Sequence, residues 1–405
     1  MSTKVENHNP LESQRKPIVV QKYGGSSVAD VACLRRVAQR VVDTTAAGFQ
    51  VVVVVSAMGS TTDELDALAR QVARVPEIRE LDMLLSVGER ISSALLAMAI
   101  VDLGQSAVSF TGSQCGIITS HRHTQARIIE VRPVRVLDEL AQDRVVVVAG
   151  YQGMSYKREV TTLGRGGSDT TAVALAAALG AEYCEIFSDV DGVKSGDPAV
   201  VEKSHHLDQL NYDQMLEFSH FGARVLNAEA VAYARREGIR IVAAATQGGQ
   251  TTSVDGQTSD RPLVGVTAIE DVVLIRCADP TPALMVLTQL LSEEQARTLW
   301  TRVERSATEL CLVRGSCHDF VRFKRAVESA LPAAEFSEPG DAVSVIGASF
   351  AEQGGQLTSC LAQLQGEGID VLGADLGPQR LTVLVGAGQR DRVQRFLHRM
   401  FVEGV

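Results

Sequence analysis

Residues that could bind an anion lie in the segment TTLGRGGSDTTAVALAAALGAE, which runs from Thr161 to Glu182. Arg165 stands between glycines, so little hinders its guanidinium from forking onto a carboxylate. Ser168 and Asp169 follow where an alanine-rich helix should begin, and we expect one of them to cap that helix. Asp169 could also orient a lysine or a hydrated magnesium ion. The alternative interpretation is a simple glycine turn with an N-cap.

A second glycine-rich segment, VVQKYGGSSV, has the pattern of a strand followed by a turn. The strand delivers Lys22, and Gly24 and Gly25 allow main-chain N–H groups to approach a ligand. Ser26 adds a hydroxyl group. A lysine beside glycine amides suits phosphate, although the Walker A pattern is absent. The alternative is a surface lysine before an ordinary turn.

Polar residues also follow the apolar run in VVVVVSAMGSTTDEL, where Ser56 and Thr62 could touch a ligand. Thr61 and Glu64 have the spacing of a helix capping box, which is an alternative explanation of the same segment. In SVGERISSALLAMAI, Glu89 could hold a substrate ammonium group. The alternative there is a solvated charged pair formed by Glu89 and the arginine that follows it.

The loop SDVDGVKSGDPA, residues 188–199, follows another strand and offers Ser188 and three aspartates. Its spacing is not that of an EF-hand, because no glutamate stands at the twelfth position. A ligand-binding loop and an ordinary acidic loop both fit this segment.

These segments need a scaffold that brings them together. The apolar runs PIVVQKYGG, FQVVVVVSAMG, RVVVVAGYQG, YCEIFSDVDG and IRIVAAAT alternate with helical stretches between residue 17 and about residue 260. This alternation predicts an α/β fold of three layers, αβα, in which helices cover both faces of a mainly parallel sheet. Ligands of such sheets bind beyond the carboxyl ends of the strands, which is where the polar segments lie.

The pattern changes after the turn-rich stretch 245–262, which we predict to be a domain boundary. From about residue 340 the order of elements is β-α-β-β-α, as in a small ferredoxin-like α+β unit, and the preceding segment follows a looser version of this plan. We therefore predict a flexible tail over 1–16, an α/β domain over 17–262 and an α+β region over 263–405.

Composition narrows the class of protein. The 405 residues include 39 Lys and Arg and 49 Asp and Glu, for a net charge of −10, which argues against nucleic-acid or anionic-membrane partners. No signal-like segment and no apolar run of about 20 residues is evident. The seven cysteines form no CxxC pair, and we expect buried free thiols in a cytoplasmic protein. No metal site is expected from His121, His123, His205 and His206, which we assign to polar loops.

Taken together, QKYGGSSV, VVVVVSAMGSTTDEL, LDMLLSVGERIS, FTGSQCG, TTLGRGGSDTTAVALAAALGAEYCEI and SDVDGV resemble the aspartate kinases of the amino-acid kinase family. The likeness covers about residues 17–262, and the tail is similar to a pair of ACT regulatory modules with the first one degenerate. The resemblance implies transfer of a phosphoryl group from MgATP to the β-carboxylate of L-aspartate, giving 4-phospho-L-aspartate. It also implies a homo-oligomer that pairs through the ACT region.

The resemblance assigns roles to matched positions. Lys22, Gly24, Gly25 and Asp169 would form the catalytic centre. Aspartate would be held by Ser56, Thr62, Glu89, Arg165, Gly166, Gly167 and Ser168. ATP would be held by Lys22, Tyr23, Gly24, Gly25, Ser26, Ser188, Asp189, Lys194, Asp197, Pro198 and Arg224. Mg²⁺ would be held mainly through the ATP phosphates. Because a carboxylate is already a nucleophile, catalysis would rest on positioning and on neutralising phosphoryl charge.

Departures from the family pattern fall mostly on the ATP side. Ala199 stands where relatives usually carry arginine, Lys194 where they carry an aromatic residue, and Arg224 where they carry lysine. The strand end 243–245 is Ala-Ala-Ala instead of Arg-Ser-Ser. We therefore expect weaker or altered nucleotide binding and an unchanged amino-acid substrate.

The tail departs further. The first module, VLIRCADPTPALMVLTQLL, lacks the glycine turn of lysine- and threonine-sensitive relatives. The hypothesis is a tail that folds and pairs subunits but responds poorly to lysine or threonine, as would suit a dedicated secondary pathway.

Two alternatives from other functional classes remain at this stage. One is a kinase of the same fold that acts on glutamate, acetylglutamate, carbamate or a modified aspartate; the Arg165 and Glu89 pair favours a free α-amino acid over these. The other is a non-catalytic, kinase-like regulatory subunit, against which Lys22 and Asp169 argue.

Overall fold

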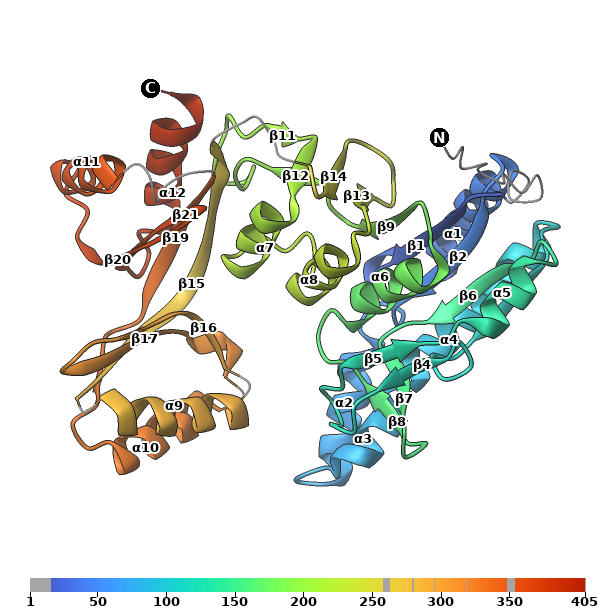
Figure 1. Cartoon of the computed structure of the whole chain (residues 1–405), viewed down its shortest axis with the longest axis horizontal. Helices are drawn as coiled ribbons and strands as arrows, with labels where there is room; N and C mark the ends of the chain where they lie inside the picture. Colours follow the sequence, from blue (N-terminus) through green and yellow to red (C-terminus); the bar gives the residue numbers. More distant parts are fainter. Residues whose placement is uncertain are drawn as a thin grey trace, which may run out of the picture. The chain divides into compact units, whose positions relative to one another are not determined.

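The computed structural model describes residues 16–257, 263–278, 280–294, 296–317, 319–347 and 354–404 (Figure 1). The chain divides into two compact units, one made of residues 1–192 and 229–256 and the other of residues 193–228 and 257–405. Residues 193–228 therefore group with the second unit, whereas the sequence assigned them to the α/β domain. The predicted tail, apart from Lys16, and residues 258–262 at the predicted boundary lie outside the described residues.

The first unit contains a central sheet, a smaller sheet and the helices around them. Its strands are β1 (Ile18–Tyr23), β2 (Gln50–Val55), β3 (Ala107–Phe110), β4 (Ile117–Thr119), β5 (Ile128–Val131), β6 (Val145–Ala149), β7 (Gln152–Ser155), β8 (Val160–Thr162), β9 (Tyr183–Ser188), β13 (Ile241–Ala245) and β14 (Thr251–Asp255). Its helices are η2 (Gly25–Val28), α1 (Val31–Ala46), α2 (Thr61–Val72), α3 (Ile78–Leu85), α4 (Val87–Asp102), α5 (Val134–Leu140), α6 (Gly167–Leu179) and α8 (Ala228–Glu237).

Within the first unit the central sheet runs in the order β14-β13-β9-β1-β2-β6-β3, and these pairs are parallel except β13 with β14. Every residue from Val51 to Val55 is at most 1% exposed, so β2 is buried on both faces. Helices α1 and α4 pack together against one face, around Leu34, Val37 and Leu96, while α6 contacts the strands β1, β2 and β9. The predicted αβα class with a mainly parallel sheet is confirmed.

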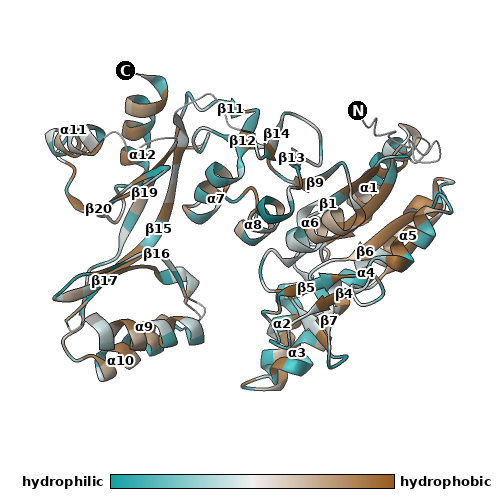
Figure 2. Cartoon of the chain, in the orientation of Figure 1, coloured by the Kyte–Doolittle hydropathy of each residue, from teal (hydrophilic) through white to brown (hydrophobic). Residues whose placement is uncertain are grey.

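Continuous apolar runs explain why these segments form buried strands. A strand covered on both faces has no solvent-facing positions, so its sequence shows no alternation. The clearest case is β6, which reads Val-Val-Val-Val-Ala and is drawn in brown in Figure 2. The predicted single strand RVVVVAGYQG is wrong at its end, however. Tyr151 has φ +66°, which turns the chain out of β6 before β7 begins at Gln152.

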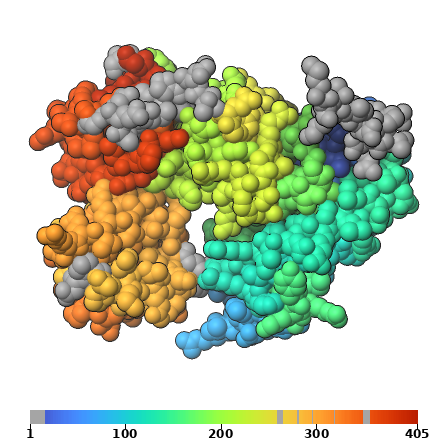
Figure 3. All heavy atoms as spheres, in the orientation of Figure 1, coloured from blue at the N-terminus to red at the C-terminus, as the bar shows by residue number. Residues whose placement is uncertain are grey.

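One stretch of the first unit, Ile78–Asp102, which contains α3 and α4, is long and apolar enough to cross a membrane by length and composition. Half of its most apolar window is buried inside the protein, a pattern that the core helix of a soluble protein shares. Asp82 and Glu89 within it are buried in the first unit. Val72 at the end of α2 and Val75 between α2 and α3 are exposed, and this part of the chain stands at the surface (light blue in Figure 3).

The second unit is built mainly on one antiparallel sheet. Its strands are β10 (Val193–Lys194), β11 (His206–Leu207), β12 (Gln209–Asn211), β15 (Leu263–Ala278), β16 (Arg297–Val303), β17 (Ala307–Val313), β18 (Glu335–Phe336), β19 (Gly340–Gly347), β20 (Val371–Gly377) and β21 (Arg380–Gly386). Its helices are α7 (Tyr212–His220), α9 (Pro280–Glu294), η3 (Arg314–Ser316), α10 (Phe320–Ala330), α11 (Gly354–Gly366), α12 (Arg390–His398) and η5 (Arg399–Glu403).

The predicted β-α-β-β-α order appears twice in this unit, but the two modules are nested. The first half of β15, Leu263–Ile269, pairs with β19, whereas the second half, Val272–Ala278, pairs with β17. Separate cores form around Val266 and Val343 in one module and around Val273 and Phe323 in the other. One long strand therefore serves both modules, an arrangement that no local pattern in the sequence reveals.

Candidate active site at the carboxyl edge of the parallel sheet

An ion pair stands where β1 ends. Lys22 Nζ lies 2.7 Å from Asp169 Oδ1, and each side chain is about one-tenth exposed. The distance is that of an ion pair, but the angles are not those of a hydrogen bond, so Oδ1 has no hydrogen-bond donor. The two charges still attract each other strongly at this distance, because Coulomb energy depends on separation and not on hydrogen-bond angles. The two predicted catalytic side chains are therefore brought together, with Asp169 Oδ1 as the ion-pair partner of Lys22.

Glycine is required in the loop after β1 because two strand ends meet there. A Cβ atom on Gly25 would lie 3.1 Å from the carbonyl oxygen of Ala57 and 3.2 Å from that of Gly59. Gly59 N donates to the Gly25 carbonyl at 3.1 Å, which fixes the loop. Gly24 lies directly beside the Lys22 side chain, because a Cβ atom on Gly24 would be 3.3 Å from Lys22 Nζ.

Tyr23 and Ser26 are placed very differently by this loop. The Tyr23 ring is buried and stacks on Phe187 with centroids 4.7 Å apart. Only the main chain of Tyr23 can face a nucleotide, because its hydroxyl donates to Gln21 inside the unit. Ser26 is exposed.

Glu89 is a buried carboxylate with a missing partner. It is 3% exposed in the first turn of α4, and its Oε1 accepts a hydrogen bond from Ala57 N at 3.1 Å. Its Oε2 is buried without any hydrogen-bond partner. Burial raises the pKa of Glu89 to about 7, and the hydrogen bond from Ala57 opposes this only in part. The solvated pair with Arg90 is therefore wrong; Arg90 is half-buried and donates to Gln152 instead.

The glycine-rich loop before α6 differs from its prediction at the helix start. Gly166, with φ +73°, is the N-cap, and α6 begins at Gly167. Neither Ser168 nor Asp169 caps the helix: both lie inside its first turn, where their side chains face the protein interior. Arg165 is exposed on this loop, as an arginine flanked by left-handed glycines can be.

Close packing holds this loop against the neighbouring strand end. A Cβ atom on Gly150, just after β6, would lie 2.8 Å from Ser168 Oγ, and one on Gly167 would lie 2.8 Å from Leu163 Cβ. These contacts leave no room for a larger residue at either glycine, and they set Ser168 beside the end of β6.

The segment after β2 does not form the capping box that was the alternative explanation of it. Thr61 donates to the Met58 carbonyl at 2.7 Å, and Ser60 is the N-cap of α2, with its hydroxyl 2.5 Å from a carboxylate oxygen of Glu64. Thr62 is half-buried in the first helical turn. Ser56 lies at the strand end, where its carbonyl accepts from the Ser92 hydroxyl at 2.7 Å.

A buried aspartate that the sequence did not single out organises the same region. Asp82, fully buried in α3, accepts hydrogen bonds from the Thr162 hydroxyl at 2.5 Å and from Thr124 N at 3.0 Å. His123 Nδ1 lies 2.7 Å from its other oxygen. This cluster ties the turn 121–124 and the end of β8 to α3, so it sets the approach to the Arg165 loop. The partners are far apart in sequence, and only the fact that Asp82 stands in a helical segment rich in apolar residues could have flagged it.

The predicted nucleotide residues are divided between the two units. Ser188 ends β9 and Asp189 is exposed after it, both in the first unit. Thr246 N and its hydroxyl both donate to the Ser188 carbonyl, at 3.0 and 3.1 Å, and the hydroxyl lies 2.6 Å from that of Ser27. The glycine loop and the end of β9 are thus tied together.

The remaining predicted nucleotide residues, Lys194, Asp197, Pro198 and Arg224, belong to the second unit. Asp197 accepts from Ala199 N at 2.9 Å in an Asx turn, and Arg224 is exposed. Within the described residues, no group of three or more His, Cys, Asp or Glu side chains is arranged to hold a metal ion. The seven cysteines are free, five of them buried, as predicted.

Comparison with known proteins identifies the architecture. The model of the amino acid kinase family matches residues 17–244. The aspartokinase of Corynebacterium glutamicum is 39% identical over 406 residues, and the match covers 96% of each chain. The chain belongs to the amino acid kinase family, among its aspartokinases. The aspartokinase of Mycolicibacterium smegmatis is 55% identical over 248 residues, which are 61% of this chain and 59% of that relative. The match with this relative therefore spans about three-fifths of the relative's length.

A solved structure extends the likeness to the whole fold. Aspartokinase III of E. coli, in complex with aspartate and ADP, superposes with a TM-score of 0.80 at 23% identity, covering 94% of this chain and 99% of that one. An aspartokinase fold therefore includes both units of the present chain.

Proposed function

We propose that this aspartokinase transfers the γ-phosphoryl group of ATP to the β-carboxylate of L-aspartate, giving 4-phospho-L-aspartate. The observation that carries the proposal is a pair of buried carboxylates at one edge of the parallel sheet: Glu89, whose Oε2 has no partner, and Asp169, which pairs with Lys22. A buried carboxylate oxygen without a partner is costly. Such a group is expected where a ligand supplies the missing donor.

Each end of aspartate has a candidate partner. Glu89 Oε2 receives the α-ammonium group, which supplies the charge that the buried carboxylate lacks. Arg165 forks onto the α-carboxylate, and the loop of Gly166, Gly167 and Ser168 shapes the site around it. Ser56 and Thr62, beside the end of β2, complete the pocket with hydroxyl groups.

The phosphoryl group is received by Lys22 and by main-chain N–H groups of Gly25 and Ser26. Gly24 allows the close approach, while its own N–H donates to the Phe187 carbonyl at 3.3 Å. Lys22 neutralises charge that develops on the phosphoryl oxygens, and Asp169 holds the ammonium of Lys22 in position through the 2.7 Å contact. The substrate β-carboxylate attacks without a general base, because it is already ionised.

Magnesium fits this site only as a companion of the nucleotide. No group of three or more His, Cys, Asp or Glu side chains gathers beside Lys22 in the described residues, so the chain supplies too few ligands for a protein cage. Mg²⁺ bound through the ATP phosphates would neutralise phosphoryl charge, with Asp169 accepting from its water shell.

Nucleotide binding is assigned to Ser188, Asp189, Lys194, Asp197, Pro198 and Arg224, with the main chain of Tyr23. Ala199 and Arg224 depart from the family pattern there, so we propose weaker ATP binding than in typical relatives. The tail, 263–405, is proposed to be a pair of ACT modules that joins subunits of a cytoplasmic homo-oligomer.

The test is an assay of ADP release by the purified full chain with L-aspartate, in which hydroxylamine traps the acyl phosphate as a hydroxamate. Turnover is expected with L-aspartate, and at least a hundredfold less with L-glutamate, N-acetyl-L-glutamate or carbamate. Arg165→Ala is expected to raise the aspartate KM and leave the ATP KM unchanged. Preferred turnover of another acid would overturn the substrate assignment, and ATP binding without any turnover would favour a regulatory subunit.

Feedback control is proposed to be weak, because the first module lacks the glycine turn of sensitive relatives. Rates measured with L-lysine and L-threonine, singly and together, are expected to stay within twofold of the uninhibited rate at millimolar concentrations. Strong inhibition by both amino acids at low concentration would contradict this.

A further inference from the structure

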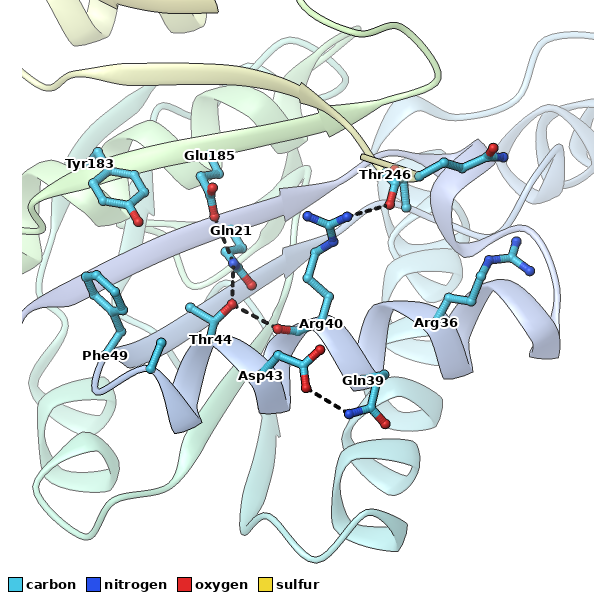
Figure 4. A pocket seen from close by; sticks show the side chains of 12 residues that line it. Gln21, Arg36, Gln39, Arg40, Asp43, Thr44, Phe49, Tyr183, Glu185 and Thr246 are labelled. Atoms are coloured by element: carbon cyan, nitrogen blue, oxygen red, sulfur yellow. Dashed lines mark hydrogen bonds between the residues drawn. The ribbon is translucent and has the colours of Figure 1, made fainter. Parts of the chain in front are cut away.

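A pocket of about 1010 Å³ lies in the first unit on the face of the sheet that α1 covers (Figure 4). Its floor is formed by Gln21 of β1 and by Tyr183 and Glu185 of β9, and its wall by α1. Successive side chains of a strand point to opposite faces, so Gln21 and Lys22 face opposite ways. The pocket is therefore separate from the proposed aspartate site.

The floor of the pocket is rigid. Gln21, 1% exposed, donates through Nε2 to Glu185 Oε2 at 2.8 Å and to the Thr44 hydroxyl at 3.1 Å. Its own carbonyl accepts from the Tyr23 hydroxyl at 3.2 Å. Both N–H directions of this amide are engaged and its oxygen accepts one hydrogen bond, so the Glu185 carboxylate is held in a fixed orientation toward the pocket.

Three charged side chains of the pocket, Glu185, Arg36 and Arg40, form no salt bridge with a described residue. Burial raises the pKa of Glu185, although the amide of Gln21 and the charge of Arg40 oppose this. Asp43, by contrast, is exposed and accepts a hydrogen bond from Gln39 at 2.9 Å.

Arg40 is also fixed in place. Its Nη2 donates to the Thr246 carbonyl at 3.0 Å, and its guanidinium lies over the Phe187 ring, 4.8 Å from the centroid. Its Nε and Nη1 donate to no described residue. Figure 4 shows Arg40 rising from the middle of α1, with Arg36 to one side and Glu185 to the other.

An apolar end completes the pocket. Phe49 and Tyr183 meet edge to face, with ring centroids 6.2 Å apart, beside Glu185. The pocket thus offers two guanidinium groups for an anion, one carboxylate for a cation and an aromatic surface next to that carboxylate. We propose that it binds a free α-amino acid with an apolar side chain, whose carboxylate meets Arg36 and Arg40, whose ammonium meets Glu185, and whose side chain packs on Phe49 and Tyr183.

The test is calorimetric titration of the full chain with L-leucine, L-phenylalanine, glycine and L-aspartate. Saturable binding of L-leucine or L-phenylalanine is expected, at least tenfold tighter than that of glycine. N-acetyl-L-leucine, which lacks the ammonium, and L-leucinamide, which lacks the carboxylate, are each expected to bind at least tenfold more weakly than L-leucine.

Matched variants locate the binding. Arg36→Ala removes an exposed guanidinium, and Glu185→Gln keeps an oxygen that can accept from Gln21, so both variants are expected to fold. Each should raise the Kd at least tenfold, whereas Arg35→Ala, an exposed neighbour on α1 outside the pocket, should leave it unchanged. Glu89→Gln should also leave it unchanged, which separates this pocket from the proposed aspartate site.

Three results would overturn the proposal. They are absence of saturable binding in the wild-type chain, binding that survives both Arg36→Ala and Glu185→Gln, and equal binding of N-acetyl-L-leucine. Binding of inorganic phosphate that Arg36→Ala weakens and Glu185→Gln does not would identify a simple anion site instead.

Discussion

The two units differ in whether they leave a buried carboxylate oxygen without a hydrogen-bond donor. In the first, Glu89 and Asp169 each bury an oxygen that has no hydrogen-bond donor. In the second, Arg380 reaches Asp375 at 2.6 Å and Glu217 at 3.1 Å. Glu294, 3% exposed, is 2.6 Å from Arg322. Within the part of the chain that the structure describes, no buried carboxylate oxygen of the second unit lacks a partner.

The comparison separates buried carboxylates that can bind a ligand from those that stabilise the fold. An unpartnered buried carboxylate lowers stability, so its presence needs a binding reason. A carboxylate that is paired away from the proposed site, as in the second unit, is already satisfied, and its removal should disturb folding and leave substrate binding alone. Substitutions of these residues should therefore change catalysis or substrate binding in the first unit and stability in the second.

Lys22→Ala should have the largest effect. It removes the cation that faces the phosphoryl group and leaves Asp169 without a counter-charge, so kcat should fall by about a thousandfold or more. Steady-state ADP release measures this, with the exposed Lys157→Ala as the control. A fall of less than about tenfold would remove Lys22 from the centre of the proposed chemistry.

Arg380→Met should destabilise the second unit by about 3 kcal/mol, because it leaves Glu217 and Asp375 without their shared cation. Burial raises the pKa of Asp375, but hydrogen bonds from Arg380 and Arg302 outweigh it and hold that pKa low. Urea denaturation measures the loss, with the exposed Arg395→Met expected to change stability by less than about 0.5 kcal/mol. A raised aspartate KM in properly folded Arg380→Met would break the distinction between the units.

Glu89→Gln should raise the aspartate KM by about a hundredfold while leaving the ATP KM unchanged. Glutamine keeps an oxygen for Ala57 N but loses the charge that the ammonium group needs. In the wild type, aspartate affinity should rise as the pH rises through about 7, since only the ionised carboxylate attracts the ammonium. A pH profile of KM that is the same in both proteins would contradict this role.

Glu89 should also make the free energy of unfolding depend on pH. The pKa of Glu89 is raised from 4.5 to about 7, so between these values the folded chain keeps a proton that the unfolded chain has lost. The free energy of unfolding should fall by roughly 3 kcal/mol as the pH rises through that window, and Glu89→Gln should remove that part of the fall. Denaturation at pH 5 and pH 8 without substrate measures the difference.

Ala199→Arg should have the smallest effect, because it adds one exposed cation to the nucleotide loop. A fall in the ATP KM of about threefold to tenfold is expected, with no change in the aspartate KM. Ala199→Gln, which adds length without charge, is the control. No improvement in the arginine variant would show that this departure from the family pattern does not weaken nucleotide binding.

Sequence was a good guide where one segment carries its own signal. The apolar runs of β1, β2, β6 and β9 predicted the parallel sheet, and Lys22 and Asp169, singled out from separate segments, lie 2.7 Å apart. Sequence failed where a backbone angle decides where an element ends, as at Tyr151 after β6. It also failed at the start of α6, where Gly166 is the N-cap in place of Ser168 or Asp169. Asp82 was missed because its partners come from distant segments.

The shared strand β15 has a consequence for the order in which the chain can fold during synthesis. Its second half can pair with β17 as soon as Val313 has left the ribosome, but its first half must wait for β19, which begins at Gly340. Until then Val266 and its neighbours present an unpaired edge, the kind of surface on which nascent chains aggregate. Translation speed between residues 313 and 347 should therefore govern the yield of soluble protein more than speed elsewhere in the tail.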